Sequence, residues 1–123
     1  MKYRNPLSRL LNASRYSLAG LRHALMNEQA FRYESFVLAV LLFFVSFAPL
    51  PLETKIFLIF AWLAVMCLEL INSAVEKAFD LIDENFRPEI KAGKDMLSAA
   101  VFIMVCFNIA LWFLIIFAIF REK

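Results

Sequence analysis

Three long apolar runs limit what this chain can fold into. They cover residues 36–52, 56–82 and 96–120, and the first and third contain no charged residue. A helix rises about 1.5 Å per residue, so about 20 apolar residues cross the hydrocarbon core of a bilayer. The chain is 63% hydrophobic, whereas soluble domains are about 45–50% apolar. The sequence therefore predicts an all-α membrane protein with a single membrane domain over residues 1–123. The predicted spans are about 30–49, about 54–82 and about 92–120.

The polar arm before the first span is predicted to form an amphipathic helix over residues 5–27. Asn5 is a preferred N-cap residue, and Pro6 suits the first helical position. On a helix, the leucines of the arm share one face about 100° wide. These are Leu7, Leu10, Leu11, Leu18, Leu21 and Leu25. An apolar stripe with arginines beside it is typical of a helix that lies on the membrane surface.

The basic residues are distributed unevenly between the two ends of the predicted spans. In a three-span protein the arm and the second connection face the same side, and together they hold ten of the thirteen lysines and arginines. The other three are Lys55, Arg121 and Lys123. Cytoplasmic segments carry an excess of Lys and Arg. We therefore expect the N-terminus and the second connection in the cytoplasm, and the C-terminus on the opposite side.

The segment ELINSAVE, residues 69–76, interrupts the second apolar run with polar groups. On a helix, five polar side chains fall within about 100° of arc. This polar seam consists of Glu69, Asn72, Ser73, Glu76 and Asp80. Glu69 is the deepest member, because the same face continues with apolar residues, so the seam predicts a wet cleft that opens to the cytoplasm. A charge in mid-span costs about 2.5–3.5 kcal/mol on insertion scales. Four explanations stay open: pairing with basic neighbours, a proton or cation relay, a metal site, or general-base catalysis.

Two further groups of charged residues lie near the predicted cytoplasmic level. Glu28 either pairs with Arg32 one turn later or adds a carboxylate to a site for a hard cation such as Mg²⁺. The second connection is expected to be a solvated loop up to Lys94 and Asp95, and Lys94 is able to hold phosphate as a point charge. With only two glycines in the chain, neither a P-loop nor a dinucleotide fingerprint is possible.

Four other side chains have simpler expected roles. Asn108 is predicted to form a hydrogen bond between helices within the membrane. Cys67 and Cys106 are expected to be buried, reduced thiols. His23 is expected to be solvated on the arm.

Four segments together resemble the prokaryotic diacylglycerol kinase family. They are ELINSAVE followed by Asp80, NEQAFRYE at 27–34, KDMLSAAV at 94–101 and RYSLAGLRHAL at 15–25. The resemblance covers nearly the whole chain. It implies a small integral membrane kinase with a surface helix and three spans per subunit, assembled as a homotrimeric helical bundle. Such a kinase would transfer the γ-phosphoryl group of MgATP to the hydroxyl of diacylglycerol and produce phosphatidic acid.

The resemblance also implies roles for individual residues. Glu69 would be the general base, and Glu28 and Glu76 would hold Mg²⁺. The nucleotide would be bound by Arg9, Tyr16, Glu28, Asn72, Glu76, Lys94 and Asp95. The lipid would be bound by Arg9, Arg32, Glu34, Glu69 and Ser98. The chain departs from the family in the second connection, where NFRPE replaces a more acidic loop, so nucleotide contacts within residues 83–93 are not carried over.

Other functions are compatible with parts of the pattern. An undecaprenol kinase would use the same scaffold, although NEQAFR and RYSLAGLR look closer to the diacylglycerol branch. A small proton-coupled transporter would need one deep carboxylate and a path to both sides, whereas this seam ends inside the membrane and carries two carboxylates. The implied partners are ATP, diacylglycerol, membrane lipids and further copies of the chain, without nucleic acid. The implied location is the bacterial inner membrane.

Overall fold

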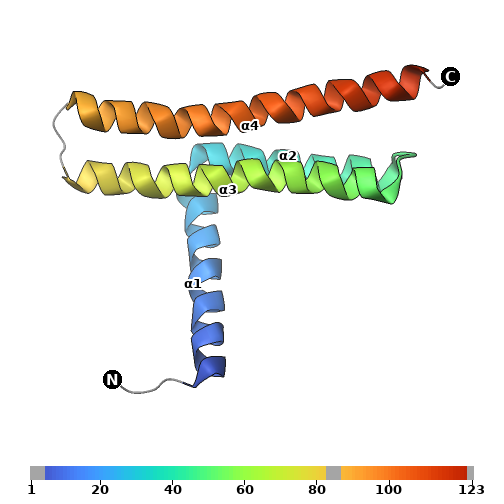
Figure 1. Cartoon of the computed structure of the whole chain (residues 1–123). Coiled ribbons are helices and arrows are strands. Elements are labelled where there is room, and N and C mark those ends of the chain that lie inside the picture. Colours follow the sequence, from blue (N-terminus) through green and yellow to red (C-terminus); the bar gives the residue numbers. More distant parts are fainter. Residues whose placement is uncertain (1–4, 83–86, 122–123) are drawn as a thin grey trace.

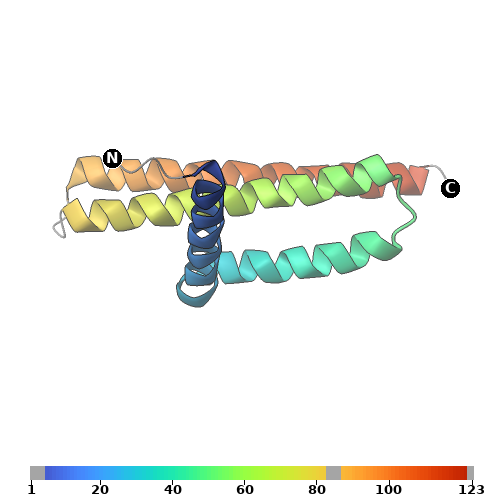
Figure 2. The ribbon, with the colours of Figure 1, turned by 90° about the horizontal axis from the view of Figure 1, so that it is seen from below.

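The computed structural model describes residues 5–82 and 87–121, which form four helices. These are α1 (Pro6–Asn27), α2 (Gln29–Phe47), α3 (Leu52–Ile82) and α4 (Pro88–Arg121). Figures 1 and 2 show α2, α3 and α4 lying along one common direction, with α1 projecting away from them. Within the described residues, α2, α3 and α4 are the helices long and apolar enough to cross a membrane. The predicted all-α membrane fold is confirmed.

The beginning and end of α1 follow from local hydrogen bonds. The Asn5 side chain accepts a bond from the Leu7 backbone N–H at 3.2 Å, and Pro6 stands at the start of the helix. At the other end, the Asn27 side-chain amide donates to the His23 carbonyl at 2.8 Å. Such side-chain bonds to a nearby carbonyl compete with continuation of the helix. The chain then turns at the single extended residue Glu28, and α2 begins at the next position.

Two apolar clusters hold the helices together. The first joins Ala24 of α1, Phe31 of α2 and Met66 of α3, so it fixes the arm against the bundle. The second lies between α2 and α3 around Leu41 and Leu58, where side chains of α4 also pack. Most other large apolar side chains are exposed, as expected for surfaces that face lipid or further protein.

The second connection is shorter than the sequence indicated. The helix that contains the predicted third span begins before residue 92, because α4 begins at Pro88. Proline suits a helix start, since its fixed φ is helical and its missing N–H would lack a partner there in any case. The Lys91 N–H donates to the Arg87 carbonyl at 3.0 Å and closes this first turn. Residues 83–86, part of the loop for which no nucleotide contacts were predicted, lie outside the described residues.

Both α3 and α4 are longer than a bilayer core requires. They have 31 and 34 residues, whereas about 20 are enough to span. The two helices approach each other closely at Gly93, where an added Cβ would lie 3.0 Å from the Phe79 ring. Two expectations near these helices differ from the structure, since Cys67 and Cys106 are exposed thiols rather than buried ones.

Asn108 links α4 to α3 in the middle of the bundle, as the sequence predicted. Its side-chain amide donates to the Ala61 carbonyl of α3 at 3.1 Å and to the Met104 carbonyl of its own helix at 2.9 Å. Within α4, all of which is described, Asn108 alone is buried. Its Oδ1 has no hydrogen-bond partner among the described residues. The cost of burying this oxygen offsets part of the stabilisation that the two donated hydrogen bonds provide.

We expect Asn108→Ala to lower the free energy of unfolding by about 1 kcal/mol or less, because hydrogen bonds between membrane helices contribute about 0.6 kcal/mol on average. Unfolding by SDS in mixed micelles measures this change. Cys106→Ala on the same helix is the matched control, because its side chain is exposed. A loss above about 3 kcal/mol, or an equal loss in the control, would contradict the modest contribution assigned to this bond.

Candidate active site

The polar seam on α3 runs from buried to exposed along the helix. Glu69, Asn72 and Ser73 are each only 8% exposed. Glu76 is half-buried and Asp80 is exposed. Ser73 follows Glu69 by one helical turn on the same face of α3. The seam therefore leads from the surface to a buried carboxylate, as the spacing of its members predicted.

Helix α2 places a second carboxylate next to this buried one. The Trp62 indole of α3 donates to the Glu34 carbonyl at 2.9 Å, which sets the level of α2 against α3. The charges of Glu34 and Glu69 are close enough to repel each other. Glu34 Oε2 is buried and has no hydrogen-bond partner among the described residues, and the same is true of Asn72 Oδ1. Two buried acceptors near Glu69 are thus free to receive a donor from a ligand.

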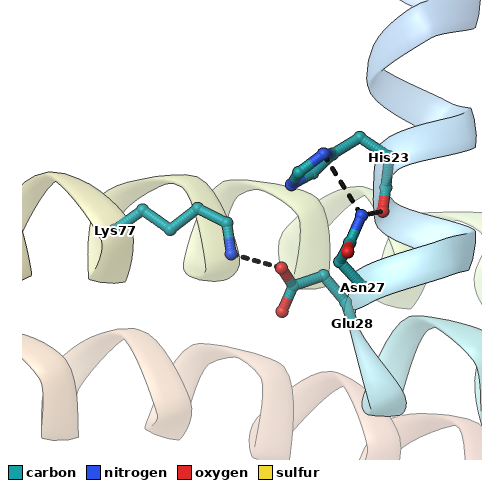
Figure 3. A network of polar contacts seen from close by, with 4 residues as sticks. All are labelled: His23, Asn27, Glu28 and Lys77. Carbon is teal, nitrogen blue, oxygen red and sulfur yellow. Dashed lines mark hydrogen bonds and ion pairs between the residues drawn. The ribbon is translucent and has the colours of Figure 1, made fainter.

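Glu28 reaches the site from the corner between α1 and α2. Figure 3 shows its carboxylate in an ion pair with Lys77 of α3, beside the contact between His23 and Asn27. The two explanations left open for Glu28 were an ion pair with Arg32 or a ligand role. The ion-pair partner of its carboxylate is Lys77, 49 positions later in the chain, rather than Arg32.

The charged residues at the ends of α3 and α4 form two more ion pairs. Lys94 pairs with Asp80 at the exposed end of the seam, and Asp95 pairs with Lys91 one turn earlier on α4. Both Lys94 and Asp95 were predicted to contact nucleotide. The structure places Lys94 beside the seam, because Asp80 belongs to it, whereas Asp95 and Lys91 are both largely exposed.

Four other predicted site residues are exposed on their helices. Arg9 and Tyr16 are exposed on α1, with Tyr16 at 71%. Arg32 and Ser98 are exposed on α2 and α4. The structure therefore brings together Glu28, Glu34, Glu69, Asn72 and Glu76 at the junction of α1, α2 and α3, and leaves the other predicted contacts at its margin.

A cleft of about 510 Å³ lies between α1 and α3. Its lining includes Ser17, Gly20, His23, Glu28, Ser73 and Lys77. The sequence did not assign His23, Gly20 or Lys77 to a site. No local signal marked Lys77, because it follows Glu76 directly and falls beside the seam. Only the crossing of α1 over α3 makes it a neighbour of Glu28.

The carboxylates at this junction suit a hard cation that keeps water or phosphate oxygens among its ligands. The described residues contain no group of three or more histidine, cysteine or acidic side chains placed to hold a metal by themselves. Mg²⁺ commonly binds through one or two carboxylates and takes its remaining ligands from water and substrate phosphates. Glu28 and Glu76 offer oxygen ligands of this kind, so the donor set fits a metal that arrives with a phosphate compound.

The sequence is similar to several known diacylglycerol kinases. The family model for prokaryotic diacylglycerol kinase matches residues 15–116. The diacylglycerol kinase of Haemophilus influenzae is 41% identical over 109 residues, which are 86% of this chain and 90% of that protein. The diacylglycerol kinase of Escherichia coli K12 is 32% identical over 111 residues, or 90% of this chain and 91% of that protein. The Pseudomonas aeruginosa diacylglycerol kinase is 34% identical over 106 residues, or 86% of each chain.

Proposed function

This chain belongs to the prokaryotic diacylglycerol kinase family and is an enzyme, a lipid kinase; from that premise we propose that it transfers the γ-phosphoryl group of MgATP to the hydroxyl of diacylglycerol, producing phosphatidic acid. The observation that carries the proposal is the buried Glu69 carboxylate, with two unpaired acceptors near it on Asn72 and Glu34. Buried polar atoms without partners cost free energy. A ligand that brings hydrogen-bond donors to these two acceptors offsets this cost.

Glu69 is the general base in this proposal. Its carboxylate accepts the proton of the lipid hydroxyl while the hydroxyl oxygen forms a bond to the γ-phosphorus. The bond between this phosphorus and the β,γ-bridging oxygen breaks, and ADP leaves. Phosphoryl transfer depends mainly on positioning and on neutralisation of phosphate charge. The gradient from the exposed Asp80 to the buried Glu69 suits this task, because a water-soluble nucleotide and a membrane lipid meet along one seam.

Glu28 and Glu76 are the proposed ligands of Mg²⁺. When bound, the cation neutralises negative charge on the phosphates. We assign nucleotide contacts to Arg9, Tyr16, Asn72, Lys94 and Asp95, in addition to the two metal ligands. We assign lipid contacts to Arg9, Arg32, Glu34 and Ser98, in addition to Glu69.

The membrane arrangement completes the proposal. We place the chain in the bacterial inner membrane, with the N-terminus and the second connection in the cytoplasm, because these segments hold ten of the thirteen basic residues. The exposed leucine stripe of α1 then rests on the membrane surface. We also propose a homotrimer. Within a single chain little of α4 is buried. In the proposed trimer, the neighbouring copies pack against its exposed surface.

A phosphorylation assay on a lipid panel tests the proposal. Purified protein in mixed micelles receives MgATP with diacylglycerol, undecaprenol or a lipid mixture without either. We expect phosphatidic acid to form from diacylglycerol at a rate well above that of the other two arms. Faster phosphorylation of undecaprenol would assign the scaffold to a polyprenol kinase. ATP-independent, pH-driven uptake of organic cations into vesicles, without lipid phosphorylation, would favour a transporter instead.

A further inference from the structure

The ion pair between Lys77 and Glu28 occupies a carboxylate that we assign to the metal. Lys77 extends from α3 toward the corner between α1 and α2, as Figure 3 shows. Both side chains line the cleft between α1 and α3. The Lys77 side chain is 51% exposed and that of Glu28 is 22% exposed. The lysine is therefore open to water, while the carboxylate it neutralises is mostly enclosed.

The backbone around Glu28 is held in place, so only its carboxylate is free to change partners. The Glu28 N–H donates to the Ala24 carbonyl at 2.8 Å, and the Glu28 carbonyl accepts from the Arg32 N–H at 3.2 Å. Nearby, Phe31 and Ala24 pack in the cluster that fixes α1 to the bundle. A cation that takes the lysine-bonded oxygen of the Glu28 carboxylate consequently displaces the ammonium rather than moving the corner.

We propose that Lys77 is a built-in competitor of the divalent cation at Glu28. This inference rests on the proposed role of Glu28 as a metal ligand. When no metal is bound, the ammonium neutralises the enclosed carboxylate. When a divalent cation takes Glu28, the long and flexible lysine side chain turns into the cleft. There it becomes a positioning residue for the phosphates of the incoming nucleotide, since lysine binds phosphate as a point charge.

Titration with Mn²⁺ alone, followed by electron paramagnetic resonance of the full-length protein in micelles, tests the competition without any turnover. We expect Lys77→Met to lower the Kd for Mn²⁺ by about five-fold, the effect of losing one partly exposed ion pair. Lys77→Arg is the opposite test. Arginine keeps the positive charge and is able to form two hydrogen bonds with the Glu28 carboxylate. The Kd of this variant for Mn²⁺ should therefore equal or exceed that of the wild type.

Two further variants separate this inference from the proposal beneath it. Lys91→Met removes the same charge from a pair on the surface of α4, and it should leave the Kd for Mn²⁺ unchanged. An equal decrease in the Kd for Mn²⁺ in Lys91→Met and Lys77→Met would mean that only the overall charge matters, which overturns the inference.

Glu28→Gln should weaken Mn²⁺ binding. If it does so while Lys77→Met has no effect, the competition is refuted and the metal role of Glu28 stands. If Glu28→Gln leaves binding unchanged, that role itself is wrong.

Discussion

Glu69→Gln should lower the turnover rate by about a thousand-fold, because general-base catalysis contributes about 10²–10⁴-fold and an amide does not accept the proton. The substitution preserves the volume of a side chain that is only 8% exposed. It also removes a negative charge that repels Glu34, Glu76 and Glu28. The free energy of unfolding should therefore stay the same or rise. The rate is measured with saturating MgATP and diacylglycerol in mixed micelles, and unfolding is followed in SDS.

The control for this experiment is Glu53→Gln. Glu53 lies on the same helix, in its first turn, and is exposed. It should retain the wild-type rate. Binding of a non-hydrolysable ATP analogue should be nearly the same in wild type, Glu69→Gln and Glu53→Gln, because the proposed base does not hold the nucleotide. A near-normal rate in Glu69→Gln would remove Glu69 from the chemistry and reopen the choice among the carboxylates of the junction.

The second large effect concerns the metal requirement. Glu28→Gln and Glu76→Gln should each raise the Mg²⁺ concentration for half-maximal rate by at least about ten-fold, since losing even a group that only supports a metal ligand costs about 10–100-fold in affinity. The rate is measured at fixed ATP over a wide range of free Mg²⁺. Partial recovery at high Mg²⁺ is expected, because each variant keeps the other carboxylate.

An exposed carboxylate outside the junction gives the comparison for these two variants. Glu89 lies in the first turn of α4 and is exposed. Glu89→Gln removes the same charge, so it should leave the Mg²⁺ titration unchanged. If Glu28→Gln has the same Mg²⁺ titration as Glu89→Gln while that of Glu76→Gln is shifted, Glu76 is a ligand and Glu28 is not. If all three titrations coincide with that of the wild type, neither carboxylate holds the metal.

Features that depend on near neighbours in the chain were predictable. The N-cap at Asn5 needs only the next few residues, and the depth order of Glu69, Glu76 and Asp80 follows from helical periodicity alone. Asn108 was predicted to bond across helices because an isolated amide in lipid needs a partner. Its partner, the Ala61 carbonyl, depends on the packing of α4 against α3.

Features that depend on how helices cross were not predictable. Lys77 was unremarkable in the sequence because it lies beside the seam, and its pair with Glu28 exists only because α1 ends at Asn27 and the chain turns at Glu28. The helix start at Pro88 was taken for a loop because proline is also common in turns. Whether a proline begins a helix or stays in a turn depends on the residues that pack around it.

The sequence by itself determined that this chain has three membrane spans, an amphipathic arm and one polar seam, because hydrophobic length and helical periodicity are local properties. Its motifs also determined the resemblance to prokaryotic diacylglycerol kinases. Only the tertiary structure decided which carboxylates meet at the junction of α1, α2 and α3, and that Lys77 forms an ion pair with Glu28. These contacts join residues far apart in the chain, and the crossing of whole helices sets the distances between them.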